Sequence, residues 1–137
     1  GRHRPELTIE KVLVQAMDKG LGEVLVGYRR DPDAGPLVML AAGGILTEIY
    51  CDRAMRLAPV SVEQAREMVS EVKALQALAG YRGRPEGDLE AIAEAVSAFS
   101  KLAMQTDCVV IEAEMNPLLV KGKGDGVVAV DALIRIA

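Results

Sequence analysis

The chain has 137 residues, half of them hydrophobic, and its 16 basic and 20 acidic residues give a net charge of −4. This length suits one domain with its own core, and no apolar run approaches the roughly 20 residues that span a bilayer. Without a signal-peptide pattern, a basic stripe or many aromatic residues, the sequence predicts a soluble, cytoplasmic protein that binds neither membrane nor nucleic acid.

The first part of the chain predicts strands. Residues 1–8 form a polar leader, and we place the domain at residues 9–137. From Lys11 to Tyr50, apolar and β-branched runs alternate with Gly and Pro punctuation, which is typical of short strands. The predicted strands are Val12–Val14, Glu23–Gly27, Leu37–Leu40 and Ile45–Tyr50. Their short connections favour antiparallel neighbours.

The middle of the chain changes to helical periodicity. Ser61, with Gln64 three residues later, matches a capping box, and Gly80 supplies a C-terminal stop. Asp88 predicts the cap of a second helix. Apolar residues recur at helical spacing, at Ala65, Met68, Val69, Val72, Leu75 and Ala79 and then at Leu89, Ile92, Ala93, Val96, Phe99 and Ala103. Two amphipathic helices of this length cover one face of a sheet.

The last part of the chain returns to strands, predicted at Val109–Ala113, Leu118–Val120 and Val127–Ile134. Strands, then helices, then strands predict an α+β fold in which two helices pack on one face of a largely antiparallel sheet.

Cysteine and histidine offer no catalytic or metal pattern. Cys51 and Cys108 are far apart in sequence, and His3 is the single histidine. A zinc site or a Cys–His nucleophilic pair is therefore not expected. Cys108 opens an apolar run and is predicted to be a small residue of the core.

Polar side chains lie near the ends of two of the last strands. Glu114-Met115-Asn116-Pro117 closes one strand, and Asp131 sits in the next. Mg²⁺ takes oxygen ligands, of which the protein usually supplies one or two while water and substrate phosphate complete the shell. The pattern therefore predicts a Mg²⁺ site against the phosphates of a nucleotide. The alternative is that Asn116-Pro117 starts a turn and that Asp131 is a solvated strand residue.

Several segments in fixed order carry a resemblance to a known family. They are Val14–Met17 with Gly22-Glu23, Asp31–Pro36, Gly43–Glu48, Asp52–Pro59, Leu78–Gly83, Glu114–Pro117 and Val130–Ala132. Together, from Ile9 to Ile136, they resemble the ATP-grasp domain of ADP-forming acyl-CoA synthetases, in the superfamily of succinyl-CoA synthetase. The resemblance covers the C-terminal lobe of that fold and the hinge strand that leads into it.

The resemblance implies a ligase that converts a carboxylic acid, CoA and ATP to acyl-CoA, ADP and phosphate, through a phosphohistidine and an acyl phosphate. It implies Mg²⁺ and ATP or ADP as cofactors. It also implies partners outside this sequence: the smaller ATP-grasp lobe, a CoA-binding module and the loop with the phosphorylatable histidine. We therefore expect a piece of a larger multidomain protein that is inactive by itself.

The resemblance also implies roles for individual residues. The hinge Gln15-Ala16-Met17 recognises adenine through its backbone, and Glu23 accepts hydrogen bonds from ribose hydroxyls; without the resemblance, Glu23 is a charge at the start of a strand. Asn116 and Asp131 match the Mg²⁺ ligands. Glu114, on the same strand face as Asn116, completes the site or orients its ligands.

Further positions are candidates for contact with phosphate or with the swinging loop. Gly43 and Gly44 permit a close backbone approach or make a simple strand corner. Arg53 and Arg56 face phosphate or the loop, or form surface ion pairs.

Two departures from the family pattern keep other functions open. Ala34 stands where an aromatic residue is usual, and Ala41-Ala42 where a glycine is usual. One alternative is a regulatory ATP-grasp-like module in a multidomain acyltransferase, which binds nucleotide or CoA without turnover. The other is a structural interaction lobe, which convergence of the proposed metal ligands in a polar cleft would contradict.

Overall fold

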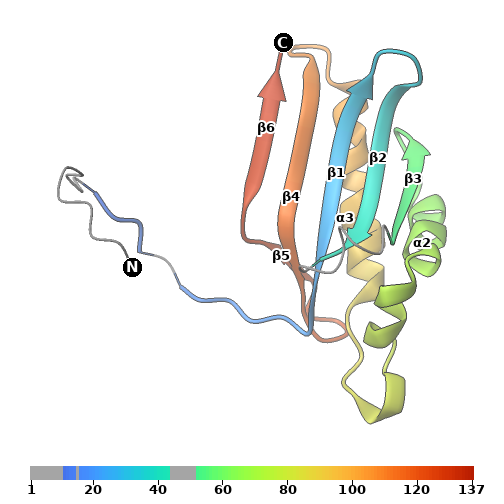
Figure 1. Cartoon of the computed structure of the whole chain (residues 1–137), viewed down its shortest axis with the longest axis vertical. Coiled ribbons are helices and arrows are strands. Elements are labelled where there is room, and N and C mark those ends of the chain that lie inside the picture. The colour runs from blue at the N-terminus through green and yellow to red at the C-terminus, as the bar shows by residue number, and fades with distance from the viewer. Residues whose placement is uncertain (1–10, 15, 44–51) are drawn as a thin grey trace.

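A computed structural model describes residues 11–14, 16–43 and 52–137. Its strands are β1 (Gly22–Asp31), β2 (Gly35–Ala42), β3 (Arg53–Leu57), β4 (Val110–Val120), β5 (Val127–Ala129) and β6 (Ala132–Ile136). Its helices are α2 (Val62–Glu71) and α3 (Leu89–Ser100), with short 3-10 helices η1 (Lys73–Leu78), η2 (Tyr81–Gly83) and η3 (Lys101–Met104). Figure 1 shows α2 and α3 on one side of the sheet, which confirms the predicted α+β fold.

The strands pair antiparallel in the order β3-β2-β1-β4-β5, and β6 also pairs with β4. β5 and β6 follow one another along the same outer edge of β4, opposite Leu118–Val120 and Val110–Met115 respectively. β1 and β4 therefore form the centre of the sheet. Among the described helices, none has the length and apolar character needed to cross a membrane.

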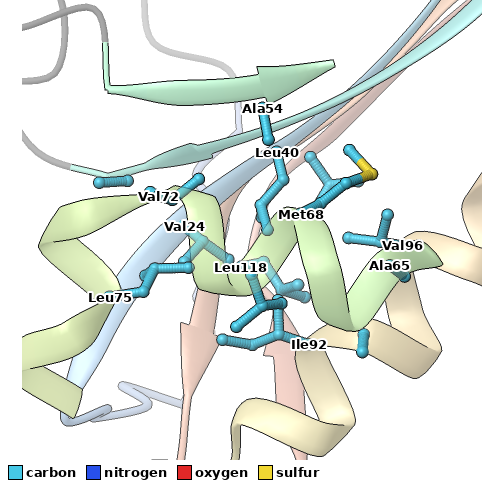
Figure 2. Close-up of a cluster of buried hydrophobic side chains, with 14 of the residues drawn as sticks. Val24, Leu40, Ala54, Ala65, Met68, Val72, Leu75, Ile92, Val96 and Leu118 are labelled. Atoms are coloured by element: carbon cyan, nitrogen blue, oxygen red, sulfur yellow. The ribbon is translucent and has the colours of Figure 1, made fainter. Parts of the chain in front are cut away.

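The hydrophobic core lies between the sheet and the two helices (Figure 2). Side chains alternate along each strand, so every second residue of β1 and β2 enters this layer. The fully buried members include Val24, Val26, Val38, Leu40, Met68, Val72, Ile92, Val96 and Val120. Burial of each large apolar side chain contributes roughly 1.5–3 kcal/mol relative to exposure, so this layer stabilises the fold.

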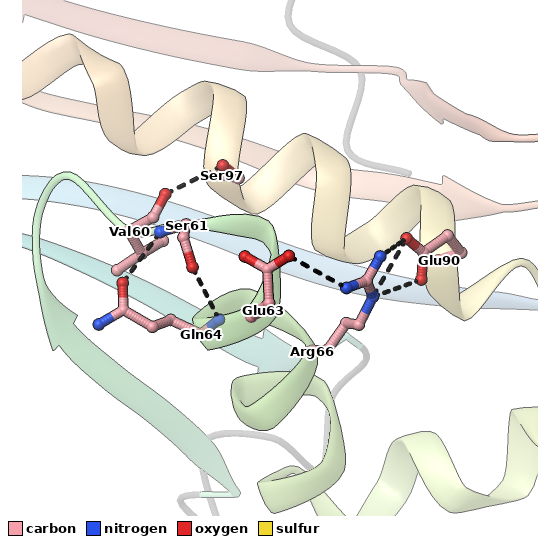
Figure 3. Close-up of polar contacts among 7 residues, drawn as sticks. All are labelled: Val60, Ser61, Glu63, Gln64, Arg66, Glu90 and Ser97. Carbon is pink, nitrogen blue, oxygen red and sulfur yellow. Dashed lines mark hydrogen bonds and ion pairs between the residues drawn. The ribbon is translucent and has the colours of Figure 1, made fainter.

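Helix α2 begins as predicted and ends earlier than predicted. The Gln64 N–H donates to Ser61 Oγ at 3.2 Å, and the Ser61 N–H donates to Gln64 Oε1 at 2.9 Å (Figure 3). A continuous helix to Ala79 is wrong, because Val72 adopts an extended conformation with ψ 101°. The Asp52 carboxylate accepts the N–H groups of Lys73 and Ala74, at 3.0 and 2.7 Å, and so caps the new helical turn.

Helix α3 is capped by Asp88, as predicted, and this carboxylate also holds a distant turn. One oxygen accepts the Ala91 N–H at 3.0 Å, and the other accepts the N–H groups of Gly124 and Gly126, both at 2.9 Å. These donors, that of Ala91 first, hold the pKa of Asp88 below its usual range. The start of α3 is thereby joined to the turn between β4 and β5.

Two buried serines join α3 to Val60, just before α2, and a surface ion pair joins the two helices; Figure 3 shows Ser97 and the ion pair. Ser97 Oγ donates to the Val60 carbonyl at 2.9 Å, and Ser100 Oγ accepts the Val60 N–H at 2.9 Å. On the surface, Arg66 of α2 donates to Glu90 of α3. The apolar periodicity gave no indication of this polar connection.

Several other expectations need correction. Residues 12–14 form no strand and are exposed, because no described strand lies beside them to pair with. β3 is not among the predicted strands, and β4 runs unbroken through Asn116-Pro117, where two strands are predicted. The single strand predicted at Val127–Ile134 is instead divided into β5 and β6, because Val130 and Asp131 lie between the two strands that pair with β4. Cys108 is exposed, since β4 begins only at Val110. The expected leader, His3, Cys51 and the strand at Ile45–Tyr50 lie outside the described residues.

Candidate metal and nucleotide site

The helix-free face of the sheet carries the polar residues of β4. Ala113 is buried and Met115 packs against the core, so both point toward the helices. Because alternate side chains of a strand point to opposite faces, Glu112 and Glu114 point the other way. The same strand therefore supplies core on one side and carboxylates on the other.

A β-bulge changes this alternation at the candidate site. Between the pairs Val24–Leu118 and Val26–Met115, β1 has one residue, Leu25, whereas β4 has two, Asn116 and Pro117. A bulge of this kind bends the strand and re-aims a side chain. Here it lets both Met115 and Leu118 face the core while Asn116 stays exposed.

Backbone hydrogen bonds hold the facing segment, between β5 and β6, against the bulge. The Asn116 N–H donates to the Asp131 carbonyl at 3.0 Å, and the Val130 N–H donates to the Pro117 carbonyl at 3.1 Å. Asn116 therefore lies directly across from Asp131. Their position opposite one another is fixed by main-chain contacts and does not depend on either side chain.

Glu114, Asn116 and Asp131 line one open hollow of about 80 Å³, together with Ala132 and Leu133. Two carboxylates and an amide oxygen form a set of hard donors, which suits Mg²⁺ or another oxygen-binding cation. No cluster of three or more His, Cys, Asp or Glu side chains suited to a metal occurs in the described ranges. A cation here would therefore need water or a phosphate to complete its shell.

A second hollow, of about 370 Å³, adjoins the first along the same face, and Glu114 lines both. Gly27 of β1 leaves room in it, since a Cβ there would make only ordinary contacts, at 3.5 Å from Met39 Cε and 3.6 Å from Leu25. Its walls include Arg29, Leu37, Met39, Met55 and Glu112. The helix-free face thus has apolar side chains directly beside Glu114, which also lines the first hollow. Sequence reasoning missed this hollow, because its residues come from β1, β2, β3 and β4.

Glu23 lies on the same strand, β1, and its side chain is exposed. The Gly43 N–H donates to the Glu23 carbonyl at 2.7 Å, and a Cβ on Gly43 would lie 2.6 Å from that oxygen. Only glycine fits so close to the backbone. Gly43 therefore allows the two backbones to lie close together, as one of the two interpretations of the sequence expects. Gly44 lies outside the described residues.

The expected adenine-binding hinge lies on the segment before β1. Ala16 and Met17 are exposed and belong to no helix or strand, and Gln15 lies outside the described residues. Figure 1 shows this segment leaving one end of β1 and running away from the sheet. The residues described after it, Asp18 and Lys19, contact Lys121 at the end of β4.

The two candidate arginines, Arg53 and Arg56, lie apart from the hollow that Glu114, Asn116 and Asp131 line. Arg53 is on β3, which β2 and β1 separate from β4, and three strand spacings amount to about 14 Å. Arg56 pairs with Glu71 of α2, and this hydrogen bond holds the pKa of Glu71 below its usual range. Neither arginine joins Glu114, Asn116 and Asp131.

Comparison with known proteins identifies the family and the fold of this chain. A family model described as an ATP-grasp domain matches residues 1–136. The β subunit of ADP-forming acetate–CoA ligase II from Pyrococcus furiosus is 39% identical over 133 residues, which are 97% of this chain and 56% of that relative. ADP-forming acetate–CoA ligase I from Archaeoglobus fulgidus is 42% identical over 124 residues, 90% of this chain and 18% of the relative.

The fold has experimental counterparts as well. The dinucleotide-forming acetyl-coenzyme A synthetase 1 of Ca. Korarchaeum cryptofilum, solved with coenzyme A and Mg-AMPPCP, superposes with a TM-score of 0.79 at 35% identity. The match covers 88% of this chain and 55% of that one. This chain thus spans 56% of the Pyrococcus relative, 55% of the solved structure and 18% of the Archaeoglobus relative. It belongs to the ATP-grasp domain family, among relatives that are ADP-forming acid–CoA ligases.

Proposed function

We propose that this chain is the nucleotide- and metal-binding C-terminal lobe of an ADP-forming acyl-CoA synthetase. The observation that carries the proposal is the convergence of Glu114, Asn116 and Asp131 in one hollow on the helix-free face. The parent would join a carboxylic acid to CoA and split ATP to ADP and phosphate. Its smaller ATP-grasp lobe, CoA-binding module and phosphohistidine loop would act as partners of this lobe.

In this proposal, Asn116 and Asp131 hold Mg²⁺ through their side-chain oxygens, and Glu114 completes or orients that set. When bound, the cation offsets the negative charge of the nucleotide phosphates. The bulge at Asn116 and the backbone bonds across to Asp131 keep the main chains of these two residues opposite one another before any ligand arrives. Catalysis of phosphoryl transfer depends chiefly on such positioning and on electrostatics.

The remaining nucleotide contacts in this proposal come from β1 and from the segment that precedes it. Glu23, on β1, would accept the ribose hydroxyls, since a carboxylate accepts two donors well. The Gly43 contact keeps the backbone of Glu23 in place. Gln15-Ala16-Met17 would bind adenine through backbone groups.

The test is Mg²⁺-dependent release of ADP by the full-length protein, supplied with ATP, CoA and a panel of short carboxylic acids. We expect ADP only when acid, CoA and Mg²⁺ are all present, and loss of at least about 100-fold on Asp131→Ala. Asp107→Ala, which removes an exposed carboxylate just before β4, is the matched control and should keep full activity. Binding of ATP without turnover would instead indicate the regulatory module, and unchanged activity of Asp131→Ala would refute the metal assignment.

A further inference from the structure

The segment that precedes β1 passes very close to the backbone at the end of β4. The Leu21 N–H donates to the Val120 carbonyl at 2.7 Å. A Cβ on Gly20 would lie 2.9 Å from the same oxygen and 3.2 Å from Leu119 Cβ. Glycine is therefore required at this approach, and it is also the residue about which a chain turns most freely. The direction of the segment beyond Gly20 must be set by other contacts.

Lys121, at the end of β4, supplies those contacts. Its ammonium group pairs with the carboxylate of Asp18 and donates to the Lys19 carbonyl at 2.7 Å. The Lys121 side chain is only 19% exposed, whereas that of Asp18 is 49% exposed. Among the described residues, no hydrogen bond or ion pair holds residues 11–14, 16 or 17 to the sheet.

We propose that Lys121 is a positioning residue for nucleotide recognition. By holding Asp18 and Lys19, it fixes the direction in which Ala16 and Met17, the described residues of the expected hinge, leave the sheet. The inference rests on the proposed function of that hinge. Without Lys121 the segment samples other directions about Gly20, and only a fraction of molecules present the hinge correctly. The apparent nucleotide affinity falls in proportion to that fraction.

A matched control lies two residues away. Lys123 sits in the same turn and also forms an ion pair, with Glu86 at 2.8 Å. Its partner belongs to the loop after η2 and does not touch the segment before β1. Lys123→Met therefore removes one lysine and one ion pair from the same turn without releasing Asp18 or Lys19.

The first measurement is the dissociation constant of Mg²⁺ with a non-hydrolysable ATP analogue, by calorimetry on the full-length protein. We expect Lys121→Met and Asp18→Asn each to weaken binding about 3- to 10-fold, the range for loss of a charge-assisted contact. The double variant should lose no more than Lys121→Met alone, because Lys121 makes both contacts and Asp18 acts only through it. Lys123→Met should bind as the wild type does.

Exchange of the two charges gives a further check. Asp18→Lys combined with Lys121→Asp should recover the part of the affinity that the ion pair supplies, while the bond to the Lys19 carbonyl stays lost because a carboxylate cannot donate to it. If Lys121→Met weakens binding while residues 16–19 keep the order that they have in the wild type, Lys121 acts on the nucleotide directly and the proposal is overturned. Unchanged affinity in both single variants also overturns it.

A second measurement is independent of the nucleotide. Backbone ¹⁵N order parameters of residues 16–19 should fall in Lys121→Met and stay unchanged in Lys123→Met. If the wild type binds no nucleotide, the proposed function fails, and these order parameters alone decide whether Lys121 holds the segment. Equal order in the wild type and Lys121→Met would show that it does not.

Discussion

The two faces of the sheet differ in what they expose and in what their residues touch. The helix-covered face is closed by α2 and α3 over an apolar layer, whereas the helix-free face presents Glu112, Glu114 and Asn116 beside two open hollows. β4 contributes to both faces through alternate residues. Stability and ligand binding are therefore separated within one strand, and substitutions on the two faces should affect different measurements.

The largest effect on stability is expected on the covered face. Ile92 of α3 is fully buried between the helices and the sheet (Figure 2). Ile92→Ala should lower the free energy of unfolding by about 2–5 kcal/mol, because it removes apolar burial and leaves a cavity. Urea unfolding measures this change. A loss below about 1 kcal/mol would contradict the packing described for this layer.

On the open face, the expected loss is in cation binding. Asn116→Ala should weaken Mg²⁺-dependent nucleotide binding by about 100-fold, since an amide oxygen of the donor set disappears. Its free energy of unfolding should change by less than about 0.5 kcal/mol, as is usual for an exposed side chain. Calorimetric titration and urea unfolding of the same samples separate the two effects. A large fall in stability would show that the faces are not independent.

Substitution of Asp88 tests the hydrogen bonds that join the start of α3 to the turn between β4 and β5. Asp88→Ala should lower the free energy of unfolding by about 1–2 kcal/mol, the usual effect of losing a helix cap. Because backbone N–H donors in the folded state, that of Ala91 first, hold the pKa of Asp88 below its usual range, its contribution is complete above the ordinary aspartate pKa of about 3.9 and is lost as the pH falls through the lowered value. The difference between wild type and Asp88→Asn should therefore shrink only below about pH 4. Urea unfolding across pH 2–7 measures it, and a difference that is constant over this range would contradict the assignment.

The smallest effect is expected at the surface pair between the helices. Arg66 and Glu90 are each half exposed, so Glu90→Gln should lower the free energy of unfolding by only about 0.2–1 kcal/mol. The loss should diminish in 1 M salt, which screens exposed charges. Thermal unfolding at low and high salt measures both. A loss above about 2 kcal/mol would place this pair among the main supports of the fold.

The covered face was largely predictable from sequence because its signals are local. A capping box and apolar periodicity depend on residues a few positions apart, and Ser61, Gln64, Ile92 and Val96 behave as predicted. The end of α2 was not predictable in this way. Val72 remains buried after the helix breaks, so its apolar character fits both the predicted and the observed conformation.

The candidate site was predictable only through its motifs. Spacing and the family resemblance predict Glu114, Asn116 and Asp131 as site residues, but the bulge opposite Leu25 and the bonds across to Asp131 depend on strand register. Lys121 was missed because its partners, Asp18 and Lys19, lie about 100 residues earlier in the chain. Contacts of that separation leave no periodic signal in the sequence.

The most direct test of the central claim is a crystal structure of the full-length protein with an ATP analogue and Mn²⁺ in place of Mg²⁺, in which anomalous scattering locates the metal. The account predicts a metal peak about 2.0–2.3 Å from side-chain oxygens of Asn116 and Asp131, with phosphate oxygens on its other side. A nucleotide-bound metal whose protein ligands include neither residue would contradict it.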